Sequence, residues 1–135
     1  MKSKKANSTT PTSWKLSLHV DFEPEFLALS EDIQNQLLTV AKAIQIAGPK
    51  AARPLVDTLT GSKHANMKEM RFTSGDGTQI WRAAFAFDPE RSGVILVAAD
   101  KQGISEKLFY RRLIAKADKR YDAHLKALML KKLEK

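Results

Sequence analysis

The amino-acid sequence predicts an α+β domain with the element order β-α-α-β-β-β-α, an antiparallel sheet with helices on one face. Three segments typical of strands follow one another across short turns, which is the pattern of an antiparallel meander. Two longer segments, one before and one after the meander, repeat apolar residues at three- and four-residue spacing, as amphipathic helices do.

The first half of the chain predicts one strand and two helices. Residues 14–20 alternate apolar and polar side chains, which is the period of a half-buried strand. Residues 25–47 carry one apolar face at helical spacing, with Ser30 as a candidate N-cap and Gly48 at the end. A short helix is expected to follow at residues 51–59.

The second half predicts the meander and a long final helix. The expected strands are residues 67–73, 79–87 and 94–99, and the turns between them are rich in glycine, aspartate and serine. From Ser105 onward the apolar residues recur at helical spacing, and Ser105 is a candidate N-cap for that helix.

Composition excludes several kinds of site. The 135 residues fit one compact domain, expected over residues 14–135, and the polar, basic residues 1–13 are expected to be a disordered tail. There is no cysteine, which excludes disulfides, thiolate zinc sites and cysteine nucleophiles. The three histidines lie 45 and 60 residues apart, unlike the ligands of a metal site, so we expect no metal and no other cofactor.

Hydropathy argues against a membrane protein. The longest apolar run, residues 94–99, is far shorter than the roughly 20 residues that span a bilayer. The first residues are basic but lack the apolar region of a secretory signal. We therefore expect a cytoplasmic protein.

Positive charge is concentrated near the end of the sequence. Of the formal net charge of +8, residues 101–135 contribute +7, from eleven basic and four acidic residues. This charge is typical of a surface that binds a polyanion or an acidic partner, although a solvated lysine-rich helix has the same composition. Lys101 and Lys107 flank the helix start at Ser105, where backbone N–H groups can bind a phosphate; ordinary capping is the alternative.

Alternation along the strands separates the two faces of the sheet. One face receives large side chains such as Phe72 and Phe85, and we expect it to meet the helices. The other face receives Glu69, Arg71 and Arg82 among small alanines, where we expect the floor of a groove. The alternative is a structural ion pair between Glu69 and an arginine on a solvated face.

Three segments of the sequence resemble the RelE/ParE superfamily of toxins, in particular its phage-derived HigB-like branch. They are residues 59–72 (LTGSKHANMKEMRF), 80–87 (IWRAAFAF) and 100–112 (DKQGISEKLFYRR). The resemblance covers about residues 14–125 and agrees with the element order derived above.

The resemblance implies a toxin of a type II toxin–antitoxin module that acts as an mRNA interferase, usually on messages bound to the ribosome. In this metal-independent chemistry a ribose 2′-OH attacks the adjacent phosphate. The reaction needs a base, cationic donors for the phosphorane oxygens and an acid for the leaving 5′-oxygen. The implied partner is a co-expressed antitoxin, a helix-turn-helix protein of the HigA type.

The resemblance also assigns roles to individual residues. Arg82 matches the arginine of the central strand and is expected to stabilise the phosphate together with Arg71, while Tyr110 is expected to stack on a base or transfer a proton. The alternating lysines of some relatives are reduced here to Lys68, so Glu69 becomes the candidate base; otherwise the catalytic residues differ or the protein is weakly active. The expected RNA and phosphate ligands are Lys68, Lys101, Lys107, Arg111 and Arg112.

Two other functions compete with the nuclease. One is a gyrase-poisoning toxin of the ParE type, and the other is a non-catalytic nucleic-acid-binding module. For the antitoxin, we expect docking on the basic final helix, through charges such as Lys119, Arg120 and Lys126. Tyr121, Leu125 and Leu128 are candidate apolar anchors, unless the domain's own core uses them.

Overall fold

The computed structural model describes residues 13–134, so nearly all of the expected N-terminal tail lies outside the described residues. The elements in chain order are β2 (Leu16–Leu18), α1 (Glu23–Leu27), α2 (Glu31–Ala47), the 3₁₀ helix η1 (Gly48–Lys50), β3 (Val56–Thr58), β4 (Lys68–Thr73), β5 (Ile80–Phe87), β6 (Gly93–Asp100) and α3 (Glu106–Leu133). The predicted α+β class is confirmed.

The sheet is mixed rather than wholly antiparallel. Its strand order is β2-β6-β5-β4-β3, and the predicted meander of β4, β5 and β6 is antiparallel. The edge strand β2 instead pairs with β6 in parallel, with Leu16 opposite Gly93. The chain leaves β2 through α1 and α2, begins again at the opposite edge with β3, and reaches β6 after three reversals of direction. The expectation of a purely antiparallel sheet was therefore wrong at this one pair.

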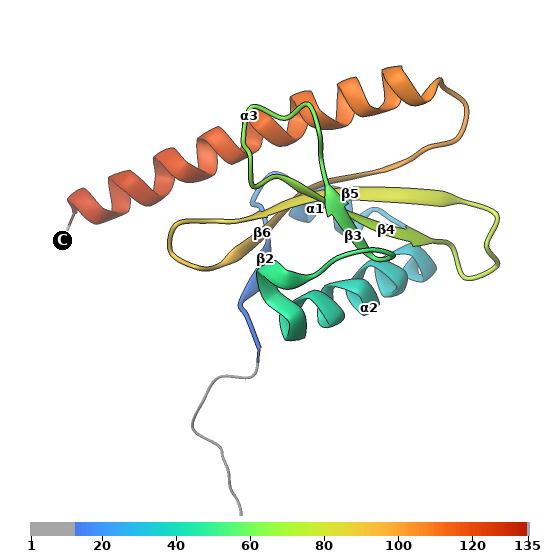
Figure 1. Cartoon of the computed structure of the whole chain (residues 1–135), viewed down its shortest axis with the longest axis horizontal. Coiled ribbons are helices and arrows are strands. Elements are labelled where there is room, and N and C mark those ends of the chain that lie inside the picture. Colours follow the sequence, from blue (N-terminus) through green and yellow to red (C-terminus); the bar gives the residue numbers. More distant parts are fainter. Residues whose placement is uncertain (1–12, 135) are drawn as a thin grey trace, which may run out of the picture.

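Helices cover both faces of the sheet, not one as the sequence predicted. Figure 1 shows α2 on one side of the sheet and α3 on the other. The aromatic face packs on α1 and α2 as expected, with Phe85 fully buried between strand and helix. On the opposite face Ala84 and Ala86 are also fully buried, because their small side chains let Leu113 and Ala117 of α3 approach closely. The alanines are thus part of a second core.

Two local predictions change in the structure. The helix expected at residues 25–47 is two helices, because Ser30 starts a new one: its Oγ accepts a hydrogen bond from the Ile33 N–H at 3.2 Å. The helix expected at residues 51–59 is absent, and Val56–Thr58 forms the edge strand β3 instead. Pro54 disfavours a helix through this segment, since it lacks an N–H and crowds the preceding turn.

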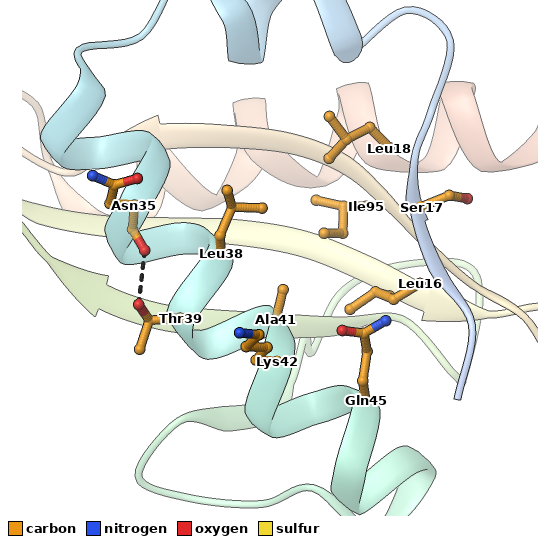
Figure 2. Close-up of a pocket in the computed structure, with 10 residues that line it drawn as sticks. All are labelled: Leu16, Ser17, Leu18, Asn35, Leu38, Thr39, Ala41, Lys42, Gln45 and Ile95. Atoms are coloured by element: carbon orange, nitrogen blue, oxygen red, sulfur yellow. Dashed lines mark hydrogen bonds between the residues drawn. The ribbon is translucent and has the colours of Figure 1, made fainter. Parts of the chain in front are cut away.

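A hollow of about 510 Å³ lies between β2 and α2. Figure 2 shows Leu16, Leu18 and Ile95 around it on the strand side and Leu38 on the helix side. Lys42 is the single charged residue that lines it, so this hollow offers little for acid–base chemistry. No helix within residues 13–134 is long and apolar enough to cross a membrane.

Candidate active site

A second, polar groove of about 340 Å³ lies on the α3 face of the sheet. It is bounded by the start of α3, by β4 and β5, and by the segment around β3. The residues that line it are Arg53, Thr58, Leu59, Thr60, Glu69, Arg71, Arg82, Lys101, Glu106 and Tyr110. All four predicted catalytic residues are among them.

Strand register brings the charged residues together. Arg71 on β4 lies directly opposite Arg82 on β5, and Glu69 lies opposite Ala84. Side chains of directly opposed residues share one face of a sheet, so both guanidinium groups and the carboxylate point to the α3 side. The alanine beside Glu69 leaves space there, which Tyr110 enters from α3.

The carboxylate of Glu69 is the centre of this cluster. Glu69 is only 5% exposed. One oxygen, Oε2, accepts a hydrogen bond from Arg71 Nη1 at 3.1 Å, and the other, Oε1, accepts one from the Tyr110 hydroxyl at 2.8 Å. Arg82 Nε lies 3.7 Å from the same Oε1. Three donors from two strands and a helix therefore surround one buried anion.

Arg82 is almost as deeply buried, at 7% exposure, and its hydrogen bonding is incomplete. Nη1 donates to the carbonyl oxygen of Trp81 at 2.9 Å. The buried Nε has no hydrogen-bond partner among the described residues. An unpaired buried donor costs about 1–3 kcal/mol. A hydrogen bond from Nε to a bound anion, or to Glu69 after a small shift of that side chain, would therefore be favourable.

The Tyr110 hydroxyl is held in its protonated form. Burial raises the pKa of Tyr110 above its ordinary value, and the hydrogen bond that it donates to Glu69 raises the pKa further. Tyr110 is thus a proton donor at neutral pH.

Lys101 lies next to Tyr110. Its Nζ is 5.5 Å from the centre of the Tyr110 ring. The same Nζ donates a hydrogen bond to Glu106 at 2.9 Å, and this bond lowers the pKa of the Glu106 carboxyl.

The start of α3 forms the rim of the groove. The Leu108 N–H donates to Ser105 Oγ at 3.2 Å, so Ser105 is the N-cap that the sequence predicted. Lys101 precedes this cap and lines the groove, whereas Lys107 follows it and is exposed outside the lining.

The wall formed by β3 and the residues next to it was not predicted from the sequence. Arg53, Thr58 and Thr60 line the groove from this side. Arg53 is held by Asp57, whose Oδ2 accepts from Nε at 3.0 Å and from Nη2 at 2.7 Å. Pro54, inside the segment expected to be helical, was the signal that could have revealed an extended wall here.

Most of the predicted phosphate ligands lie outside the groove. Lys68 alternates with Glu69 and so belongs to the opposite face of β4, and Arg111 is exposed on α3. Arg112 lines a separate hollow together with Lys116 and Lys119. Only Lys101 of the expected phosphate ligands contributes to the groove itself. Among residues 13–134, no group of three or more His, Asp or Glu side chains is arranged to hold a metal ion.

Comparison with known proteins gives consistent matches. Residues 24–122 match the family described as "Phage derived protein Gp49-like (DUF891)". Two proteins of Mycobacterium tuberculosis, whose names designate them as toxins HigB2 and HigB3, are 35% identical over 97 residues and 38% identical over 95 residues. These alignments cover 72% and 70% of this chain, 47% of HigB2 and 79% of HigB3, so the chain matches about half the length of HigB2. No solved structure matches the chain significantly.

Proposed function

The chain belongs to the phage-derived Gp49-like family of RelE-like toxins. We therefore propose that it is the toxin of a type II toxin–antitoxin module and that it cleaves mRNA. The observation that supports the cleavage is the convergence of Arg71, Arg82 and Tyr110 on Glu69 inside a polar groove. The proposed reaction is attack of a ribose 2′-OH on the adjacent phosphate, which yields a 2′,3′-cyclic phosphate and a free 5′-OH.

The two arginines are proposed to stabilise the developing negative charge on the phosphorane. They are cross-strand neighbours, so their guanidinium groups can bind adjacent oxygens of one phosphate. Neither needs to move far, because both already face the single anion of Glu69. Fixed donors of this kind are effective because they are oriented before the charge develops.

Glu69 and Tyr110 are proposed to be the base and the acid. The Oε1 atom of Glu69 releases the Tyr110 hydroxyl and binds the ribose 2′-OH in its place. It then accepts the proton of the 2′-OH. The released Tyr110 hydroxyl donates its own proton to the leaving 5′-oxygen. When the Tyr110–Glu69 hydrogen bond forms again, the proton on Glu69 passes to the phenolate oxygen, and both residues return to their starting forms.

The wall with Arg53, Thr58 and Thr60 is proposed to bind the RNA strand next to the scissile phosphate. A guanidinium and two hydroxyl groups can bind phosphate and ribose oxygens without selecting a base. The proposed partners are mRNA on the ribosome and a helix-turn-helix antitoxin of the HigA type. The names of the two relatives, which designate toxins, support an antitoxin partner.

The test is cleavage of a defined mRNA with and without ribosomes, followed by analysis of the ends of the products. We expect cyclic phosphate ends with the wild-type chain and a large loss of cleavage with Arg82→Ala. Lys42→Ala, on α2 at the other face of the sheet, is the matched control and should cleave normally. Inhibition of gyrase supercoiling without RNA cleavage would instead support the ParE-type function. Binding of RNA without either activity would support a non-catalytic module.

A further inference from the structure

The last turns of α3 extend beyond the sheet. The helix has 28 residues, which corresponds to about 42 Å. Figure 1 shows its C-terminal end projecting past the turn between β5 and β6. Tyr121 is the last fully buried residue of α3 within the described part of the chain. We call residues 125–133 the α3 overhang.

The α3 overhang exposes large apolar side chains. Met129, Leu130 and Leu133 are 66%, 52% and 76% exposed. A hollow of about 300 Å³ lies where the overhang meets the turn between β5 and β6, lined by Pro89, Glu90, Leu125, Leu128, Met129 and Lys132. Single exposed apolar residues are common on protein surfaces, whereas several that cluster around a hollow are typical of an interaction surface.

The charges around the overhang are mostly positive. Lys126, Lys131 and Lys132 lie within it and are exposed, whereas the lining of the hollow contains one acidic residue, Glu90. These lysines continue the basic character of α3, whose region from residue 101 onward carries a net charge of +7. A segment that binds here must supply apolar side chains for the hollow and negative charge for the lysines.

A second copy of this chain fits the overhang poorly. Two overhangs packed together would bring the lysines of one copy close to the lysines of the other, and like charges at an interface are unfavourable. We propose that the α3 overhang is the docking surface for an amphipathic, acidic helix of a different protein. Identifying that protein as the antitoxin rests on the function proposed above.

This surface overlaps only in part with the one expected from sequence. Tyr121 is buried in the domain's own core, so it cannot be an anchor. Arg120 is engaged within the protein, by Glu25 and by the carbonyl oxygen of Leu96, so it is not a free docking charge. The other expected anchors, Leu125 and Leu128, line the hollow of the overhang and stay in the proposal. Met129 and Leu133 are added to them, because both side chains are exposed at the end of the helix.

Docking at the overhang leaves the groove open. Tyr110 and Met129 are 19 residues apart on one straight element, which corresponds to about 28 Å along the helix axis. A helix held at the overhang therefore does not reach the groove. Inhibition must come from a second segment of the same partner, which docking brings to a high effective concentration near the groove.

The experiment measures binding of the purified product of the neighbouring reading frame to the full chain. Met129→Glu and Leu133→Glu should each weaken binding at least 10-fold, because a carboxylate would be buried against apolar and acidic groups. Both side chains are exposed, so unfolding temperatures should match the wild type. Ile46→Glu, at another exposed apolar residue on α2, is the matched control and should bind normally.

Three results would overturn the proposal: no binding to the wild-type chain, equal binding by the overhang variants, or self-association in sedimentation that the variants abolish. RNA cleavage by the free variants should equal that of the wild type. Overhang-dependent binding by a wild-type chain that cleaves no RNA would refute the nuclease and leave this proposal intact.

Discussion

The hydroxyl oxygen of Tyr110, early in α3, lies 2.8 Å from the buried carboxylate of Glu69 on β4. This hydrogen bond joins the helix to the sheet at the point where the groove forms. Because the two residues are 41 positions apart, the bond exists only when α3 is packed on the sheet. The candidate acid and base are therefore linked through the tertiary fold.

Arg82→Ala should remove cleavage and leave the domain folded. The lost cation faces the proposed phosphorane, and loss of one such donor costs on the order of 3–4 kcal/mol, or 10²–10³-fold in rate. The measurement is the single-turnover rate on a defined RNA, with thermal unfolding as the check on folding. Arg82→Lys, which keeps the charge but lacks the forked guanidinium, should recover only part of the rate. A folded Arg82→Ala chain with wild-type cleavage would refute this site.

Tyr110→Phe distinguishes the two roles that the sequence left open for this residue. If Tyr110 donates a proton, loss of the hydroxyl should lower the rate about 10²–10⁴-fold, since general-acid catalysis contributes that much. If Tyr110 only stacks on a base, the phenylalanine ring should keep most of the activity. We expect the large loss, because the Tyr110 hydroxyl already donates a hydrogen bond to Glu69 inside the groove.

Arg53→Ala should raise KM several-fold with little change in kcat. Arg53 lines the groove away from the Glu69 cluster and is fixed by Asp57, so it is placed to bind the RNA strand rather than the reacting atoms. Removing one phosphate contact should also weaken the dependence of binding on salt. The slope of log affinity against log salt concentration should become less steep by about one unit or slightly less. KM and affinity measured over a range of salt concentrations test both effects. A fall in kcat at unchanged KM would instead place Arg53 in the chemical step.

Acid should weaken the ion pair between Glu25 on α1 and Arg120 on α3. Hydrogen bonding by Arg120 lowers the pKa of Glu25 below its ordinary value of 4.5. A carboxyl whose pKa is lowered by folding stabilises the native state fully above its ordinary pKa, and the contribution is lost as pH falls through the lowered value. Unfolding temperature should therefore drop below about pH 4.5 more steeply in the wild type than in Glu25→Gln. Parallel curves for the two proteins would contradict this link.

The sequence predicted that the central residues of the candidate site share one face of the sheet, because the relevant signal is local. Alternation along β4 and β5 is enough to place Glu69, Arg71 and Arg82 on one face, whatever packs above them. It also predicted Ser105 as the N-cap of α3, since capping depends on a few neighbouring residues.

The features that the sequence missed depend on distant partners. β3 has three residues, too few for a periodic signal, and it is a strand because Val56 pairs with Met70. The alanines of β5 suit an open groove or a closely packed helix equally well, and the position of α3 decides between them. The parallel pairing of β2 with β6 likewise has no signature in either strand alone.

That parallel pairing affects how the chain is made. Leu16 is synthesised 77 residues before Gly93, the residue it faces across the sheet. At about 5–20 residues per second, β2 emerges from the ribosome roughly 4–15 s before the strand that it needs. During this interval the nascent chain holds an unpaired strand, and Tyr110 has not yet been added. The sheet can therefore be completed only after Gly93 has emerged, and the groove only after Tyr110 has followed it.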